Sequence, residues 1–330
     1  MKKVLLLSFL LFFLVGCSNR SQSKVTNNLI KKYKNSSGYK IVGDLEITNN
    51  DEVYNYNVTS TYDKRNGFYK IVFVNKSNDF EQIILKNSDG VFLLSPSLNK
   101  SFKFNSNWPY NNSQLYLFET LINDIKSTND LKFEFKDNKY IYYTNVNYPN
   151  NRKLVKQKII FDEKLKPNMV CVYDKDNKVI MKYMINKFSL NPSFDKDYFT
   201  LNIEKNEDED SNTEKTMALD DIVYPLFLPS GTKLVDEKKV DKDNGQRVIM
   251  TYDGEKSFLL VEETLDVFND FMVIPSYGEP LQLMDTIGVM TDNSLSWSSG
   301  NIEYYLVSDV MGKDELIEIA QSIVGVSSLK

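Results

Sequence analysis

Apolar and polar residues alternate in short runs through much of the first two thirds of the chain, a period typical of half-buried β-strands. Two pairs of such runs flank Asn66-Gly67 and Asp89-Gly90, dipeptides that favour tight hairpin turns. The alternation predicts strands at 53–62, 68–74, 83–85, 91–94, 133–135, 139–144, 153–161, 169–173 and 179–188. This part of the chain is therefore expected to form an antiparallel sheet.

Two segments show the spacing of an amphipathic helix instead. The first has apolar residues at Val25, Leu29, Ile30 and Tyr33, and Ser36-Ser37-Gly38 ends it. The second has Asn112 or Ser113 as its expected N-cap. Its apolar stripe consists of Leu115, Phe118, Leu121, Ile122 and Ile125. Many strands with two such helices predict a mainly β fold, a curved antiparallel sheet that wraps over helices and is long enough to curl into an open barrel.

The concave side of such a sheet can be packed core or a ligand cavity, and the pattern alone does not decide between the two. If it is a cavity, the apolar residues of the second helix are its expected lining. These candidates are Leu115, Phe118, Leu121, Ile122 and Ile125.

Residues 204–216 contain no apolar side chain, so they are expected to be an acidic linker between two domains. The first domain then covers 25–203 and the second 217–330. The second is expected to be a small α+β domain with strand pairs around Asn244-Gly245 and Asp253-Gly254, and with a loop at 275–280. Its strands are predicted at 247–252, 258–262, 281–290 and 302–308, and a closing helix at 313–324.

The N-terminus has the pattern of a bacterial lipoprotein signal peptide. Lys2 and Lys3 precede an apolar run over 4–15, which is too short to span a bilayer core of about 30 Å. Leu14-Val-Gly-Cys17 matches the lipobox, so residues 1–16 are expected to be removed and Cys17 to carry diacylglycerol and palmitate. Residues 17–24 would be the tether, and the chain would lie at the extracytoplasmic face of the membrane. An ordinary signal peptide that ends near a cysteine is the alternative.

Charge divides unevenly along the chain. Residues 17–203 carry 28 Lys and Arg against 19 Asp and Glu, whereas residues 217–330 carry 8 against 20. A basic half beside the anchor would suit an anionic membrane surface or wall polymer, although solvated faces give the same count. Nucleic acid is not an expected partner of an exported, acidic protein.

Composition and motifs argue against an enzyme. The chain has no histidine, which removes the commonest general base and zinc ligand, and no cofactor or metal site is expected. Ser97-Leu-Asn-Lys100 matches S-x-x-K but lies in a turn without the companion motifs, and Asp241–Gly245 resembles a calcium loop with the wrong spacing. Cys171 is expected to be a buried thiol. Trp108 and Trp297 are expected to be core or loop anchors, with a binding-surface role as the alternative for Trp108. A hydrolase that uses carboxylates alone is the remaining enzymatic alternative.

Several segments resemble the LolA/LolB-like family of outer-membrane lipoprotein carriers. They are 81–103, 156–167 with its Lys-Pro turn, 172–180 with a charged hairpin, Phe188-Ser-Leu-Asn-Pro192 and Asp197-Tyr-Phe199. The resemblance covers 25–203 and implies a half-open antiparallel barrel closed by helices over an apolar concavity. It gives no site residues, because these families act through surfaces and cavities.

The rest of the chain departs from a carrier, because Cys17 would anchor it and a second domain follows. The pattern from Trp297 through Gly300 and Tyr304 to Ile323 is similar to YdcC-type sporulation lipoproteins of Gram-positive bacteria. The first domain resembles GerS-type germination lipoproteins, and the two-domain plan resembles the RseB/MucB regulators.

These resemblances imply a membrane-anchored, non-enzymatic binding or scaffold protein of sporulation or germination. Its protein partner at the membrane surface would be a cell-wall enzyme or an envelope-signalling protein. A carrier or sensor that binds a lipid or acyl chain in the barrel is the alternative.

Overall fold

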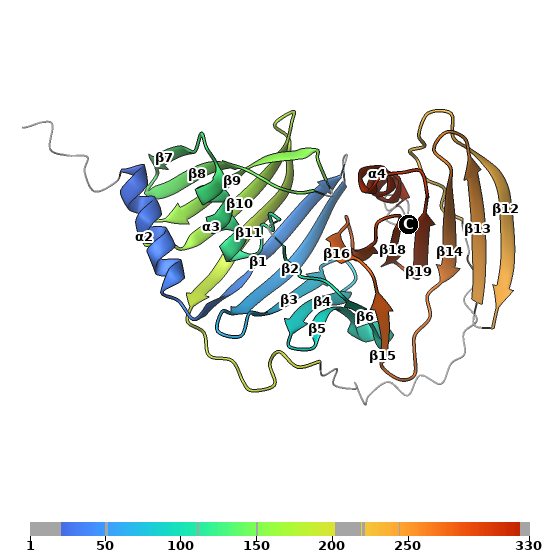
Figure 1. Cartoon of the computed structure of the whole chain (residues 1–330), viewed down its shortest axis with the longest axis horizontal. Helices are drawn as coiled ribbons and strands as arrows, with labels where there is room; N and C mark the ends of the chain where they lie inside the picture. Colours follow the sequence, from blue (N-terminus) through green and yellow to red (C-terminus); the bar gives the residue numbers. More distant parts are fainter. Residues whose placement is uncertain are drawn as a thin grey trace, which may run out of the picture.

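The computed structural model describes residues 21–49, 52–110, 112–149, 151–201, 219, 222–243 and 245–323. The predicted signal peptide, Cys17 and the predicted linker over 204–216 lie outside these residues. The described part forms an elongated body with α2 (Gln22–Lys34) at one end and the strands of a second sheet at the other (Figure 1). Within the described ranges, every helix is too short or too polar to cross a bilayer.

A large sheet, here called sheet A, forms the first part of the body. Its twelve strands run in the order β15-β6-β5-β4-β3-β2-β1-β11-β10-β9-β8-β7. In chain order they are β1 (Gly38–Asn49), β2 (Glu52–Asp63), β3 (Phe68–Asn75), β4 (Glu81–Asn87), β5 (Gly90–Ser95), β6 (Lys100–Phe104), β7 (Lys132–Lys136), β8 (Lys139–Asn145), β9 (Leu154–Asp162), β10 (Pro167–Asp174), β11 (Val179–Leu190) and β15 (Met272–Ser276). All neighbours pair antiparallel except β15 and β6, which are parallel.

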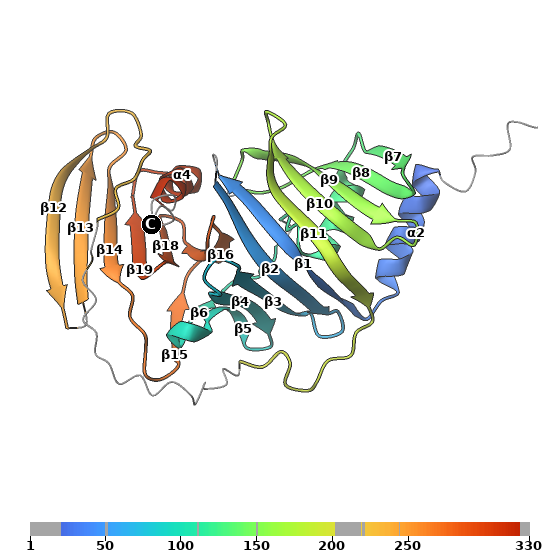
Figure 2. The ribbon, with the colours of Figure 1, turned by 180° about the vertical axis from the view of Figure 1, so that it is seen from behind.

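The sheet curves around two helices, α2 and α3 (Phe118–Ser127), as the front and rear views show (Figures 1 and 2). Alternate residues of its strands point inward and form one core with the buried faces of the helices. The sheet does not close on itself, because its edges are β15 and β7. The predicted fold class, mainly β with a half-open antiparallel sheet over helices, is confirmed.

A smaller sheet, sheet B, forms the other end of the body. Its seven strands run in the order β12-β13-β14-β19-β18-β17-β16. They are β12 (Lys233–Lys242), β13 (Gly245–Asp253), β14 (Phe258–Thr264), β16 (Glu279–Gln282), β17 (Ile287–Met290), β18 (Ser294–Ser299) and β19 (Ile302–Val307). The closing helix α4 (Lys313–Ile323) packs on β18 and β19 and buries the apolar face that its spacing predicts.

Several sequence predictions need correction. The second helix does not begin near Asn112 or Ser113 but at Phe118. The Ser113 hydroxyl is used elsewhere, because it donates to Asp124 Oδ1 at 3.0 Å and accepts the Asn147 N–H at 2.8 Å. The Thr120 hydroxyl donates to the Gln114 carbonyl at 2.7 Å, which holds the preceding turn outside the helix.

The strand predictions also missed β1, β6, β15 and β18, and the strand expected at 281–290 is broken. Residues 283–286 form a turn between β16 and β17, closed by a hydrogen bond from the Leu283 N–H to the Thr286 carbonyl at 2.9 Å. The loop expected at 275–280 was wrong at both ends, because 272–276 is β15 and 279–282 is β16.

Candidate binding site at the junction of the sheets

The residues expected to line a cavity all lie in the core of sheet A, and none is more than 3% exposed: Leu115, Phe118, Leu121, Ile122 and Ile125. The Phe118 ring contacts Tyr33 edge-on at 5.6 Å and Tyr39 at 6.0 Å between ring centroids. The structure thus brings the five together under the concave face, packed against other side chains. Their use as a ligand lining stays a prediction.

The open end of the concave face is occupied by a segment from the other sheet. Residues 283–286, here called the mouth loop, project from sheet B toward sheet A. Met284 and, from β17, Ile287 and Val289 belong to the core of sheet A and not to that of sheet B. Burial of three such side chains contributes several kcal/mol, of the order of 1.5–3 kcal/mol each. The two sheets therefore share a core.

Polar groups of sheet A hold the mouth loop in place. The Gln82 amide pairs with the backbone of Ile287 as a neighbouring strand would, donating to its carbonyl at 3.0 Å and accepting its N–H at 2.7 Å. The Thr286 hydroxyl donates to the same Gln82 oxygen at 3.0 Å. The Tyr56 hydroxyl donates to the Met284 carbonyl at 2.7 Å, and the Asn75 amide donates to the Asp285 carbonyl at 3.2 Å. These bonds satisfy the backbone of a loop that is removed from water.

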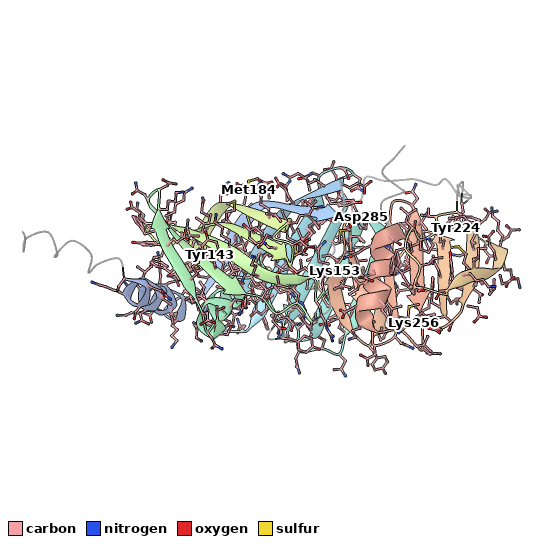
Figure 3. All side chains as sticks on the ribbon, turned by 90° about the horizontal axis from the view of Figure 1, so that it is seen from above. Tyr143, Lys153, Met184, Tyr224, Lys256 and Asp285 are labelled. Carbon is pink, nitrogen blue, oxygen red and sulfur yellow. The ribbon has the colours of Figure 1, made fainter. Side chains whose placement is uncertain are left out.

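Charged pairs connect the two sheets on either side of this loop. Lys100 at the start of β6 forms a largely buried ion pair with Glu303 of β19. At the other side, Arg152 lies 3.2 Å from Asp314 and Lys153 lies 2.7 Å from Glu318, both on α4. Figure 3 labels Lys153 where the strands of sheet A meet that helix. The exposed pairs contribute little, whereas loss of one partner of the buried pair would leave a charge without compensation.

A groove lies beside the mouth loop, between both sheets. It has a cavity volume of about 60 Å³, which is room for a few water molecules. Its lining combines side-chain amides and apolar groups with one hydroxyl and one carboxylate: Asn112, Gln114, Asn151, Gln282, Ser113, Glu279, Tyr116, Tyr148, Pro149, Leu154, Met181, Pro280 and Leu281. One wall is β16, the last strand of sheet B, which pairs with β17 alone among the described strands. An edge strand next to side-chain amides and apolar side chains can pair with an extended polypeptide.

Among the described residues, four wholly or partly buried carboxyl groups have raised pKa values, and each has its own polar partners. Burial raises the pKa of Glu119, although the Tyr39 hydroxyl donates to it at 2.5 Å. Burial raises the pKa of Asp124 to about 6, that of Asp285 to about 6 and that of Glu262 to about 7. Asp124 joins the loop before α3 to Gln157 of β9 at 2.6 Å, and Asp285 joins the mouth loop to Ser299. These groups tie elements together inside the protein.

Glu262 has a similar structural role in sheet B. Its side chain is buried, and one carboxylate oxygen accepts the Val223 N–H at 3.1 Å. This bond fixes the segment that precedes β12 onto the sheet. The neighbouring Glu263 points to the opposite face, where it pairs with Arg247, as the strand alternation predicts.

Other residues that the sequence singled out are structural. Ser97 is exposed in a 3₁₀ turn (Pro96–Leu98) between β5 and β6, and Lys100 is engaged by Glu303, so the S-x-x-K match holds no nucleophile pair. Cys171 is buried, and burial raises the pKa of its thiol. Trp108 and Trp297 are both core residues. Residues 241–243 lie at the hairpin between β12 and β13, as expected, whereas Asn244 lies outside the described residues.

Sequence reasoning missed the residues that build the junction. Gln82 stands at an inward position of β4, where the neighbouring inward residue is Ile84, so a buried amide was a detectable exception in an apolar face. Glu119 is a charged residue between apolar positions of the α3 stripe, which is a similar signal. No local pattern marks Tyr56 or Thr286, because their partners lie more than 200 residues away in the chain.

Comparison with known proteins gives one relative with high sequence similarity. The chain is 38% identical over 330 residues to sporulation protein YdcC of Bacillus subtilis (strain 168), covering 98% of this chain and 97% of that protein. No protein-family model matches the chain.

Three similar solved structures share little sequence with it. MucB in the MucA/MucB complex of Pseudomonas aeruginosa is similar over 92% of this chain and 98% of that chain, at 11% identity and a TM-score of 0.34. A LolA superfamily protein from Nitrosomonas europaea covers 52% of this chain and 96% of its own, at 11% identity and a TM-score of 0.28. A chain from the complex of the CwlD amidase with the GerS lipoprotein of Clostridioides difficile is similar over 54% of this chain and 97% of its own length, at 14% identity and a TM-score of 0.18.

Proposed function

Because the chain belongs to the family of the sporulation protein YdcC, we propose that it is a non-enzymatic binding protein of the sporulating cell. A lipid on Cys17 holds it at the extracytoplasmic face of the membrane. There it binds a polypeptide segment of a cell-wall enzyme or an envelope-signalling protein. The binding site is the junction groove between sheet A and sheet B.

The observation that carries this proposal is the composition of the groove. Side-chain amides at Asn112, Gln114 and Asn151 face a wall of Pro280 and Leu281 on an edge strand. Amides pair with the backbone of an extended peptide, and the apolar groups accept its alternate side chains. The shared core and the hydrogen bonds between Gln82 and Ile287 hold the two sheets in a fixed arrangement. A preformed groove lowers the entropy cost of binding.

The mouth loop favours this binding role over a lipid carrier. Met284, Ile287 and Val289 belong to the packed core on the concave side of sheet A, where an acyl chain would have to lie. The Gln82 and Tyr56 hydrogen bonds to this segment would have to break before a chain could replace them. A segment that lies along the open edge of β16 would leave these hydrogen bonds in place.

Photo-cross-linking in sporulating cells tests the proposal. A benzophenone amino acid is placed at Asn112 in the groove or, as a matched control, at the exposed Asn57 on the outer face of β2. A discrete protein adduct is expected from position 112 and not from position 57. Equal adducts from both positions, or none from position 112, would contradict the assignment of the groove.

A functional comparison uses the same pair of residues. Asn112→Arg should reduce the yield of heat-resistant spores, because it places a long cation in the groove, whereas Asn57→Arg should sporulate like the parent. Both proteins must be present at parental levels in the membrane fraction. Normal sporulation of a well-expressed Asn112→Arg strain would rule out the groove as the working site.

Native mass spectrometry of the chain from Ser18 addresses the carrier alternative. A protein that binds peptides through its groove should appear at its unmodified mass. A lipid-sized adduct retained by the folded protein would favour the carrier instead.

A further inference from the structure

The helix α2 forms one end of the elongated body, and the strands β12 and β13 lie near the other end (Figures 1 and 2). The axis of α2 runs across the long dimension of the body, so its outer face forms the end surface. Whatever this face contacts therefore sets the orientation of the whole protein.

The inner face of α2 buries Val25 and Leu29 against sheet A. A helix turns 100° per residue, so positions 24, 27, 31 and 34 form a stripe on the opposite side. This outer stripe consists of Lys24, Asn27, Lys31 and Lys34, all exposed. The helix itself contains no acidic residue, so its own charged side chains are all basic.

Further lysines flank the stripe. Lys32 donates to the carbonyl of Lys164 at 2.7 Å, which places the basic turn between β9 and β10 beside α2. Lys64 donates to the carbonyl of Lys34 at 2.8 Å, close to the end of the helix. Glu163 is the acidic residue of the neighbouring turn. The end surface of the body is therefore predominantly basic.

Helix stability accounts for only part of this pattern. Lysines in the last turn complement the negative end of the helix dipole, which explains Lys31, Lys32 and Lys34. Lys24 stands in the first turn, where the dipole disfavours a cation. The dipole therefore does not explain why the basic stripe continues to this end of the helix.

We propose that the outer stripe of α2 lies on the anionic phospholipid headgroups of the membrane. This inference rests on the lipid anchor in the proposed function. The five residue steps from Cys17 to Gln22 reach at most roughly 18 Å, so an acylated Cys17 keeps α2 next to the bilayer surface. The negative surface potential of the leaflet attracts the stripe at that distance.

The consequence is an upright protein. With the α2 end on the membrane, the long axis of the body points away from the bilayer, and sheet B stands at the distal end. Residues 217–330, with 8 basic against 20 acidic side chains, would be repelled by the anionic leaflet. Attraction at one end and repulsion at the other select the same pose.

Vesicle co-sedimentation of the unacylated chain from Ser18, which keeps every described residue, tests the stripe without the anchor. Vesicles contain phosphatidylcholine with phosphatidylglycerol, or phosphatidylcholine alone. Salt-sensitive binding to the anionic vesicles only is expected. Equal binding to both vesicles, or no binding to anionic vesicles at low salt, would overturn the proposal.

A charge-matched pair of triple variants isolates the stripe. Lys24, Lys31 and Lys34 are replaced by glutamine together, and the control replaces the exposed Lys175, Lys196 and Lys239. Each lysine near an anionic surface is expected to raise the affinity roughly five-fold. The stripe variant should therefore bind anionic vesicles roughly a hundredfold more weakly at low salt, and the control variant should lose much less affinity. Equal loss in both would show that only net charge matters. Circular dichroism verifies that both fold.

A soluble polyphosphate separates a membrane surface from a free polyanion. If the parent binds polyphosphate at least as tightly as the anionic vesicles, a polymer replaces the bilayer as the ligand and the proposal fails. Because no anchor and no groove residue enters these measurements, their failure would leave the cross-linking test of the proposed function unaffected.

Discussion

Replacement of Gln82 by leucine should loosen the junction at a calculable cost. The Gln82 amide is the hydrogen-bond partner of both the N–H and the carbonyl of Ile287, and both residues are at most 5% exposed. A buried backbone group without a partner costs about 1–3 kcal/mol. Loss of both bonds therefore predicts that Gln82→Leu lowers the free energy of unfolding by about 2–6 kcal/mol, with a further loss for the Thr286 hydroxyl.

The two tryptophans allow each sheet to be followed separately. Trp108 lies in the core of sheet A and Trp297 in that of sheet B. Urea unfolding is monitored by fluorescence in single-tryptophan backgrounds, Trp108→Phe and Trp297→Phe. In the parent, the shared core predicts coincident transitions. In Gln82→Leu, the Trp297 transition should move to lower urea and separate from that of Trp108, because sheet B loses its attachment.

Gln22→Leu is the matched control, because Gln22 is exposed at the start of α2 and its amide makes one long bond of 3.4 Å. It should change stability by less than about 0.5 kcal/mol. If Gln82→Leu leaves both transitions as close to the parent as this control does, the hydrogen bonds at Ile287 do not hold the junction and the reasoning fails.

Three further outcomes follow from buried or modified groups. Lys100→Met should destabilise the protein by about 3 kcal/mol in urea unfolding, since it leaves Glu303 unpaired, whereas Lys103→Met on the same strand should have little effect. Burial raises the pKa of Glu262 from 4.5 to about 7, so the protonated side chain stabilises the folded protein and the ionised side chain opposes folding. The stabilising contribution of the protonated form is therefore lost as the pH rises through this range. Glu262→Gln should therefore flatten the stability profile between pH 4.5 and 7 and stabilise the protein at pH 8 by about 3 kcal/mol; an unchanged profile would contradict the assignment. Cys17→Ala should abolish labelling by radioactive palmitate and release the chain from the membrane fraction; continued labelling would exclude Cys17.

The sequence pattern predicted most of the strands that pair with a strand adjacent to them in the sequence. Hairpins at Asn66-Gly67 and Asp89-Gly90 join neighbouring strands, and the turn chemistry is sufficient to define them. The strand β1 also had a detectable signal in the alternation of Tyr39, Ile41 and Leu45, interrupted by Gly43. Gly43 is required there, because a Cβ would lie 2.3 Å from the Met184 carbonyl oxygen.

Elements defined by distant partners could not be predicted in this way. The strand β15 contains Pro275 and lies between turn-rich segments, so its sequence favours a loop. It becomes a strand because β6, roughly 170 residues earlier in the chain, offers a parallel edge. The same reasoning applies to the mouth loop, where Gln82 supplies the hydrogen bonds that a local strand would supply. Packing across the junction overrides local propensity.

The two proposals constrain each other through the geometry of the body. If the outer stripe of α2 lies on the membrane, the junction groove stands between the bilayer and the distal sheet B, on the side of the long axis and not at its end. A segment that enters the groove then has to rise from the membrane surface along sheet A, or approach laterally from the wall. A short juxtamembrane segment of a membrane protein could not reach the groove, because the whole width of sheet A separates it from the α2 end. A protein partner that enters the groove of a chain held in this orientation therefore extends well beyond the bilayer surface.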